Sequence, residues 1–261
     1  MPEVDGARSA TSHHENVTWC SPDAPPGAMI GDLRRHRAIG WRGAVAREEA
    51  ARWSAAIVAA RSLWHADFGG EQFTLGRAFY THLEEERLAE YFRDARAADA
   101  EVEGTAPGLQ ARMRAIVAQI TGGRVTSRSD FCGAGVHIFP PGEKVARAGG
   151  VVHFDLEGLP KSFLASGRQA ITVVLTLQDV AGGGLRFWNA RYDPAANTDE
   201  ARVASRARAR DAEVRRAARG DVIVFDSFVL HQIEPFDGDA PRLSATLHAM
   251  QIAKDTWETW F

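Results

Sequence analysis

The amino-acid sequence predicts an α+β protein in which helices come first and antiparallel strands follow. In the first half, Ala-, Leu- and Arg-rich segments with apolar residues at helical spacing are separated by glycines. After Gly123 the chain becomes rich in Val, Ile, Phe and Thr, in short runs broken by Gly, Pro and Asp, which is typical of antiparallel strands. The chain has 261 residues, 45% of them hydrophobic and 25% charged, so we expect one large domain with a sizeable core.

The first residues differ in composition from the rest. Residues 1–28 mix Ser, Pro, Gly, Asp and His without a hydrophobic period and end in SPDAPPG, which predicts a flexible N-terminal arm. We expect a single domain over residues 29–261. Its helical part is residues 29–123, and its strand-rich core is residues 124–253.

Three helices are predicted in the first half. The apolar spacing and the glycines that follow each segment mark their ends. The predicted helices cover residues 47–63, 82–98 and 108–121.

Seven short runs in the second half are predicted strands. They cover residues 135–139, 150–156, 170–180, 184–192, 221–228, 230–236 and 242–252. Seven short strands with tight connections predict a barrel or a sandwich with the helices packed on its outside. An Arg-rich insertion, residues 193–219, interrupts the series. It is predicted to be a solvated helix or loop, with a lid over a site as the alternative.

Charge and cysteine content exclude several classes of protein. The formal net charge of -3 provides no basic field for the phosphates of nucleic acid. Cys20 and Cys132 are too few and too far apart for a disulfide framework or a Cys-based zinc site. The start of the chain does not resemble a signal peptide, and the apolar run AAIVAA (residues 55–60) is too short to cross a bilayer. We therefore expect a cytoplasmic protein that binds neither membrane nor nucleic acid.

Four His-x-acid triplets occur, where about one is expected by chance. They are residues 13–15, 65–67, 82–84 and 153–155. In a strand, residues i and i+2 point to the same face, so the predicted strand at 150–156 aims His153 and Asp155 together. The other three are predicted to lie in the arm, at the end of a helix and at the start of a helix, where they have a structural role.

A third metal ligand is expected from a later strand. His231 follows the run DVIVFDSF after a short turn, so an antiparallel arrangement can return it beside His153. Two imidazoles and one carboxylate on one face of an octahedron, with the other positions open, are typical of non-haem Fe(II) sites. A closed structural zinc site requires a fourth protein ligand, and the sequence offers no evident one.

Arg242 and Ser244 share one face of the last predicted strand. A guanidinium and a hydroxyl that point into one cavity predict a clamp for a carboxylate, because the planar fork of Arg grips both carboxylate oxygens. A surface ion pair of Arg242 is the alternative. His248 shares the same face, as a cavity residue or as a packed core histidine.

Taken together, His153-x-Asp155, His231 and Arg242-x-Ser244 resemble the signature of the Fe(II)/2-oxoglutarate-dependent oxygenases of the double-stranded β-helix (jelly-roll, cupin-like) fold, over about residues 124–253. The resemblance implies that His153, Asp155 and His231 hold Fe(II) and that 2-oxoglutarate chelates the iron through its C1 carboxylate and keto oxygen. It also implies that Arg242 and Ser244 bind the far carboxylate and that dioxygen takes the last position, with succinate and CO2 released.

The same resemblance bears on residues outside this set. Many relatives have a polar group that contacts 2-oxoglutarate where this chain has His137, so a co-substrate contact and a core histidine both remain open. Related halogenases have a small residue at the position of Asp155, so the carboxylate favours hydroxylation. Further candidates for the walls of the site are Arg77, Tyr80, Thr172, Val174, Thr176, Arg186 and Trp188.

Three functions are consistent with this reading. The first is a dioxygenase that oxidises a small molecule, such as a free amino acid or a specialised metabolite. The second is a peptidyl or prolyl-type protein hydroxylase, for which we expect an open groove. The third is a jelly-roll module that binds a metal or a 2-oxoacid without turnover. The sequence leaves the oligomeric state open.

Overall fold

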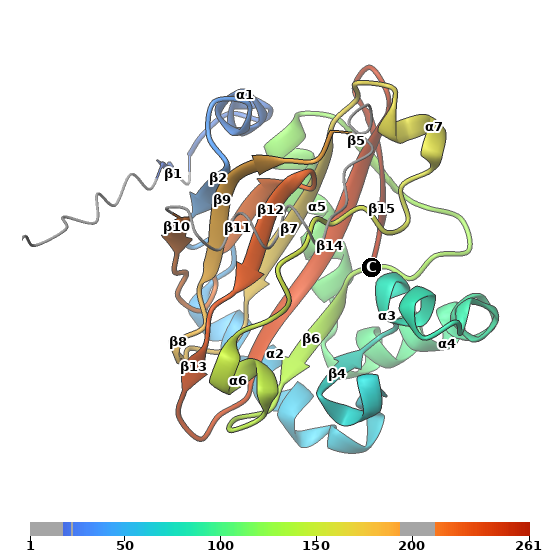
Figure 1. Cartoon of the computed structure of the whole chain (residues 1–261), viewed down its shortest axis with the longest axis vertical. Coiled ribbons are helices and arrows are strands. Elements are labelled where there is room, and N and C mark those ends of the chain that lie inside the picture. Colours follow the sequence, from blue (N-terminus) through green and yellow to red (C-terminus); the bar gives the residue numbers. More distant parts are fainter. Residues whose placement is uncertain (1–17, 22, 194–211) are drawn as a thin grey trace, which may run out of the picture.

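The computed structural model describes residues 18–21, 23–193 and 212–261 (Figure 1). The helices are α1 (Ala28–Leu33), α2 (Arg47–Ala59), α3 (Phe79–Glu84), α4 (Leu88–Thr105), α5 (Leu109–Thr121), α6 (Lys144–Ala148) and α7 (Lys161–Leu164), with two short 3-10 helices, η1 (Arg61–Leu63) and η2 (Phe68–Gly70). The strands are β1 (Trp19–Cys20), β2 (Ala38–Trp41), β3 (His65–Asp67), β4 (Gln72–Leu75), β5 (Arg124–Ser127), β6 (Gly135–Phe139), β7 (Ala170–Thr176), β8 (Ala181–Gly182), β9 (Leu185–Arg191), β10 (Ala212–Arg215), β11 (Val222–Asp226), β12 (Val229–Ile233), β13 (Phe236–Asp237), β14 (Arg242–Ala253) and β15 (Thr256–Trp260).

The main sheet has the strand order β1-β2-β11-β7-β14-β6-β4-β3, with β15 beside β14 and β5 beside β15. The pairs β1–β2 and β15–β5 are parallel, and the others are antiparallel. Strand β14 is 12 residues long and lies between β7 on one side and, in succession, β6 and β15 on the other. The end of β14 that begins at Arg242 is thus flanked by strands on both sides.

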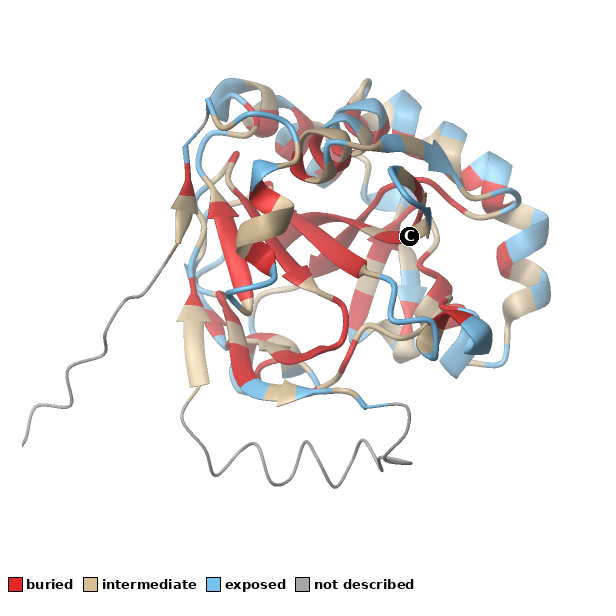
Figure 2. Ribbon diagram, turned by 90° about the horizontal axis from the view of Figure 1, so that it is seen from above, coloured by how far each residue is buried: buried red, intermediate tan, exposed pale blue. Residues whose placement is uncertain are grey.

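The two faces of the main sheet have different neighbours. Ile171, Val173 and Leu175 of β7 are buried in one core with apolar residues of α2 and α5. Thr172 and Val174 alternate with them and point to the opposite face, where they line a cavity. Figure 2 shows the buried positions concentrated in these central strands. The period of two along a strand therefore separates the helix-packed core from the site.

A second, three-stranded sheet has the order β10-β9-β12, and β13 pairs with β8. Within the described ranges the strand pairings form three separate sheets and do not close into a barrel, so of the two predicted arrangements, a barrel or a sandwich, the closed barrel is not formed. The reason is the turn at Ser227 and Phe228. Strand β11 before it pairs with β2 and β7, whereas β12 after it pairs with β9. The chain passes from one sheet to the other within two residues.

The predicted helices are present, with different ends. Helix α2 ends at Ala59 instead of residue 63, and α5 fits the prediction closely because Gly108 (φ 80°) and Gly122 (φ 68°) bound it in left-handed conformations. The predicted helix over residues 82–98 is two helices, α3 and α4. The break between them includes Glu86, which has a φ of 59°.

The N-terminal half also contributes strands that the sequence analysis missed. Strands β2, β3 and β4 belong to the main sheet. Trp19 and Cys20 pair with β2, so the folded part of the chain begins before the predicted boundary at residue 28. Residues 1–17 of the predicted arm lie outside the described residues.

Two predicted strands and the predicted insertion differ in the structure. Residues 150–156 form an extended segment with one isolated bridge instead of a strand. The amide of Gln232 donates to the carbonyl of Gly150 at 2.8 Å, so a side chain bonds there in place of a regular ladder. Strand β7 ends at Thr176 instead of residue 180. Residues 194–211 of the predicted insertion 193–219 lie outside the described residues. Its later part contains β10, which pairs with β9.

Candidate metal centre

His153, Asp155 and His231 converge at the inner face of the second sheet. Oδ1 of Asp155 lies 3.3 Å from Nε2 of His153 and 3.5 Å from Nε2 of His231. The three ligand atoms all lie within 4.8 Å of one another. Atoms bound about 2.1 Å from one metal at right angles are about 3 Å apart, so a modest contraction brings these three onto one ion.

The backbone carries two of these side chains to the same place. The backbone N–H of His153 donates to the carbonyl of His231, and that of His231 to the carbonyl of His153, each at 3.0 Å. The N–H of Asp155 donates to the carbonyl of Ser227 at 3.0 Å. Because His153 and Asp155 are two residues apart in an extended segment, both project to the side of His231.

Both imidazoles have the same orientation. Nδ1 of His153 donates to the carbonyl of Val151 at 2.9 Å, and Nδ1 of His231 donates to the carbonyl of Val229 at 3.0 Å. A carbonyl only accepts, so Nδ1 of each ring carries a proton, and Nε2 is the nitrogen that faces Asp155 and is left to bind a metal. Such outer hydrogen bonds are the usual way in which a protein fixes the tautomer of a metal-binding histidine.

The charges of the three groups are coupled. Burial raises the pKa of Asp155, but the neighbouring imidazoles outweigh it and hold the pKa well below its usual range. Burial lowers the pKa of His153, yet the hydrogen bond and the charge of Asp155 raise it to about 9. Burial lowers the pKa of His231 to about 4 despite the same carboxylate. At neutral pH the group is thus an ionised Asp155, a neutral His231 and a His153 that holds an additional proton. A metal cation that binds to these three side chains displaces that proton.

The three residues open into a cavity of about 220 Å³ between the two sheets. Its walls include alternate residues of β14, namely Arg242, Ser244, Thr246 and His248. Arg242, Ser244 and His248 share one face, as the period of two along a strand predicts. Strand β7 supplies Thr172 and Val174, and the N-terminal half supplies Tyr80 and Phe79.

Arg242 is a buried cation, with 6% of its surface exposed. Its Nε donates to the carbonyl of Gly183 at 2.8 Å and its Nη1 to Oγ of Ser244 at 3.1 Å. Burial lowers its pKa to about 10, so the guanidinium stays charged at neutral pH. The surface ion pair considered as an alternative is thus wrong. These two contacts use two of the five N–H donors of the side chain, and the group lines the same cavity as the triad.

His137 of β6 lines the cavity and lies opposite Ser244 in the sheet. Its ring centroid is 4.8 Å from that of Phe261 and 5.7 Å from that of Tyr80. The side chain is buried, its Nδ1 has no hydrogen-bond partner, and burial lowers its pKa to about 3. A neutral imidazole has one donor and one acceptor nitrogen, and here no hydrogen bond uses Nδ1.

Some candidate wall residues lie elsewhere. Arg186 pairs with Glu234 at 2.8 Å, Arg77 lies 3.5 Å from Glu101, and Trp188 packs in a separate core cluster. Thr176 lies beside a smaller cavity. Several other wall residues were not predicted, because no pattern in the sequence marks them. They are Phe68, Glu71, Gln72, Phe139, Lys144, Phe225, Trp260 and Phe261.

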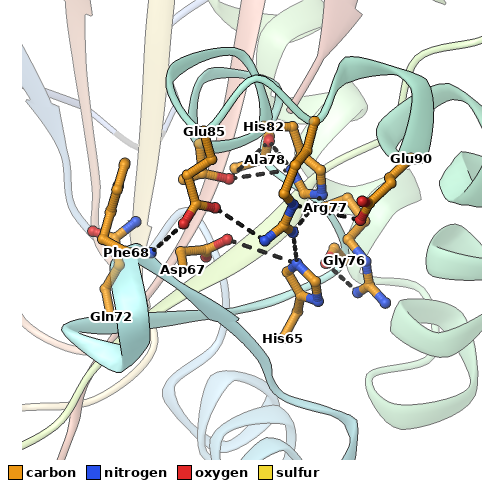
Figure 3. A network of polar contacts seen from close by, with 12 residues as sticks. His65, Asp67, Phe68, Gln72, Gly76, Arg77, Ala78, His82, Glu85 and Glu90 are labelled. Atoms are coloured by element: carbon orange, nitrogen blue, oxygen red, sulfur yellow. Dashed lines mark hydrogen bonds and ion pairs between the residues drawn. The ribbon is translucent and has the colours of Figure 1, made fainter.

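A second polar cluster surrounds the His65-x-Asp67 triplet (Figure 3). These residues form β3, so their predicted place at the end of a helix is wrong. The guanidinium of Arg87 donates to Nε2 of His65 at 2.5 Å, whereas Asp67 is 4.0 Å from that nitrogen. The lone pair of His65 is thereby occupied, which fits the predicted structural role. Among the described residues, His153, Asp155 and His231 make the one group that could hold a metal ion.

The remaining two triplets are resolved in part. His82 is buried near the end of α3, where its Nδ1 donates to the carbonyl of Ala78 at 2.9 Å, so it ends a helix instead of beginning one. Glu84 lines the cavity. The triplet at residues 13–15 lies outside the described residues.

The chain shares its fold with solved non-haem enzymes. No family model and no curated protein matches the sequence. AviO1 from Streptomyces viridochromogenes Tue57 aligns with a TM-score of 0.56 and 16% identity over 87% of this chain and 95% of that one. The α-ketoglutarate-dependent carbocyclase SnoK from nogalamycin biosynthesis aligns with a TM-score of 0.54 and 15% identity, over 85% of this chain and 83% of that one. An N-substituted L-amino acid dioxygenase from Burkholderia ambifaria AMMD, in complex with α-ketoglutarate, aligns with a TM-score of 0.53 and 16% identity, over 90% of this chain and 91% of that one.

The fold is thus shared with solved α-ketoglutarate-dependent enzymes (α-ketoglutarate is 2-oxoglutarate), and a His-Asp-His group lies inside it. In the part of the chain that the structure describes, no helix combines the length and the apolar character needed to cross a bilayer.

Proposed function

We propose that the protein is an Fe(II)- and 2-oxoglutarate-dependent dioxygenase that oxidises a small molecule and releases succinate and CO2. The observation that carries the proposal is the convergence of one carboxylate oxygen and two imidazole nitrogens within 4.8 Å, in a cavity that also contains a buried guanidinium. Two imidazoles and one carboxylate leave three positions of an octahedron open for other ligands.

The residues fit the group that they would hold. Both Nε2 atoms and Oδ1 of Asp155 face the same point, and the two Nδ1 protons are already bonded to carbonyls. Bound iron supplies the activation of dioxygen and the oxidative decarboxylation of 2-oxoglutarate. The protein supplies the oriented ligands and a partly apolar cavity.

Arg242 and Ser244 are proposed to bind the far carboxylate of 2-oxoglutarate. The guanidinium of Arg242 lines the cavity, and its Nε donates to the carbonyl of Gly183. A planar cation fixed in this way is suited to bind a dianionic co-substrate. A buried cation without an anion is unfavourable, which supports an anionic ligand beside it. His137 of β6 lies opposite Ser244 of β14, and it is proposed to add a neutral hydrogen-bonding group to this end of the cavity.

The substrate is proposed to be a free amino acid or a specialised metabolite. The cavity of about 220 Å³ suits a small molecule, and the N-terminal half lines it with the rings of Phe68, Phe79 and Tyr80. Similar folds in a carbocyclase of nogalamycin biosynthesis and in an N-substituted L-amino acid dioxygenase support a small-molecule substrate. Peptidyl hydroxylation and non-catalytic binding of a 2-oxoacid remain the alternatives.

Succinate formation tests the proposal. Protein prepared without oxygen is given Fe(II) and 2-oxoglutarate and exposed to air, and succinate and dioxygen are measured without a primary substrate and then with free amino acids, small metabolites and proline-containing peptides. We expect slow succinate formation that a small molecule stimulates. Binding of 2-oxoglutarate without any succinate would establish the non-catalytic alternative, and stimulation by peptides alone would establish the peptidyl hydroxylase.

A further inference from the structure

The two carboxylate oxygens of Asp155 have different surroundings. Oδ1 faces the Nε2 atoms of His153 and His231 at 3.3 and 3.5 Å. Oδ2 points away from them and accepts a hydrogen bond from Oγ1 of Thr172 at 2.6 Å. This distance is typical of a hydroxyl that donates to a charged acceptor and shorter than that between neutral groups.

Thr172 is itself held from three sides. It lies within β7, between Phe225 of β11 and His248 of β14, and 2% of its surface is exposed. Its hydroxyl is 3.1 Å from Oγ of Ser227 and 3.1 Å from Nδ1 of His248. The ring of His248 stacks on Trp260 at 5.6 Å.

The number of donors and acceptors on the Thr172 hydroxyl determines the direction of its three hydrogen bonds. A hydroxyl has one proton to donate and two lone pairs. Because a carboxylate accepts only, the proton of Thr172 goes to Asp155, and the hydroxyl accepts from Ser227 and from the Nδ1–H of His248. A buried series of hydrogen bonds that starts in the main sheet thus ends on one oxygen of the Asp155 carboxylate.

We propose that Thr172 is a positioning residue that keeps Asp155 a one-oxygen ligand and aims Oδ1 at the metal. This inference rests on the proposed function. A carboxylate can bind a metal with one oxygen or with two. Occupation of Oδ2 by Thr172 opposes the two-oxygen mode, and so preserves the open positions that a co-substrate and dioxygen require.

The test compares variants that differ in one hydroxyl. Thr172→Val keeps the shape and removes the donor, Thr172→Ser keeps the donor, and Thr259→Val is the matched control. Thr259 is as deeply buried as Thr172, and its hydroxyl donates to the carbonyl of Thr126 at 3.2 Å. It does not line the cavity. Binding of Co(II), followed by calorimetry and by its visible spectrum without 2-oxoglutarate, reports both affinity and coordination.

We expect Thr172→Val to weaken Co(II) binding by roughly ten- to a hundredfold and to change the visible spectrum, as loss of an outer-shell partner typically does. Thr172→Ser should bind within a few-fold of the wild type, and Thr259→Val should bind like the wild type although its melting temperature falls. If Thr172→Val does not fold, Ser227→Ala, which removes a contact to the hydroxyl but not the bond to Asp155, should still lower the affinity by a few-fold.

Two results overturn the inference, and they are distinguishable. Unchanged affinity and spectrum in Thr172→Val, or in Ser227→Ala where the former is unfolded, reduce Thr172 to a structural residue and leave the proposed function intact. Failure of the wild-type protein to bind any divalent metal removes the proposed function and this inference together.

Discussion

His153 and His231 face each other across a single antiparallel bridge, in which the backbone N–H of each residue donates to the carbonyl of the other at 3.0 Å. Their rings lie 4.3 Å apart, with Asp155 beside both. The backbone therefore sets the separation of the two imidazoles, and the carboxylate completes the group.

Removal of the carboxylate tests the ligand set. Because the bridge is made by backbone atoms, Asp155→Gly and Asp155→Ala should fold, but Fe(II) affinity and succinate formation should fall by about a hundredfold or more. Glu48→Gln, at an exposed carboxylate of α2, is the control and should behave like the wild type. Full iron-dependent turnover in Asp155→Gly contradicts the assignment of this ligand.

The clamp for the far carboxylate is tested by Arg242→Lys. Lysine keeps the charge but loses the planar fork, so the 2-oxoglutarate concentration for half-maximal rate should rise by roughly ten- to a hundredfold. Arg186→Lys is the matched control, because Arg186 pairs with Glu234 outside the cavity. An unchanged requirement in Arg242→Lys moves the clamp to another residue.

His137→Phe separates the two interpretations of this residue. Phenylalanine keeps an aromatic ring between Tyr80 and Phe261 but has no hydrogen-bonding group. If His137 contacts 2-oxoglutarate, the KM for 2-oxoglutarate should rise several-fold while Fe(II) affinity stays unchanged. The interpretation as a core histidine gains support from an unchanged KM together with equal or greater thermal stability.

Asp67 should make the stability of the fold depend on pH. The side chain is fully buried, and burial raises its pKa to about 7. The unfolded value is about 3.9, so between about pH 4 and pH 7 the folded state binds the additional proton. The stabilisation from this proton is complete below about pH 4 and is lost as the pH rises through 7.

Urea denaturation at pH 5 and pH 8 measures this effect. Between pH 5 and pH 8 the free energy of unfolding of the wild type should fall relative to that of Asp67→Asn, by at most about 3 kcal/mol, because about two pH units separate pH 5 from the folded pKa. Glu85 and Arg87 also face this carboxyl and act in opposite directions. The exposed Asp239 provides the control variant, Asp239→Asn. Equal pH dependence in wild type and Asp67→Asn would show that Asp67 is ionised in the folded state.

Two glycines make a matched pair for packing. A Cβ on Gly135 of β6 would lie 2.1 Å from the ring of Phe261 and 2.9 Å from the carbonyl oxygen of Leu75, whereas a Cβ on Gly104 of α4 meets nothing within 4 Å. Gly135→Ala should lower the free energy of unfolding by about 1–3 kcal/mol. Gly104→Ala should raise it by about 0.5–1 kcal/mol. Equal effects of the two changes in thermal unfolding would contradict the close packing of Phe261.

Local patterns predicted the elements whose signals are local. Helix α5 was predicted almost to the residue because its apolar period is bounded by two glycines in left-handed conformations. The shared face of Arg242, Ser244 and His248 followed from the period of two along a strand. Strands such as β3 and β4 were missed because they are three and four residues long and depend on pairing with distant segments.

The sequence by itself determined the residue types of the candidate site and their spacing, which are His153-x-Asp155, His231 and Arg242-x-Ser244. The tertiary structure alone decided that the first three converge, and that Thr172 holds the second oxygen of Asp155. The physical reason is the separation along the chain of the residues that interact. Side-chain direction within an element follows from backbone geometry, whereas the meeting of residues 153, 172 and 231 depends on how two sheets face each other, which no local pattern encodes.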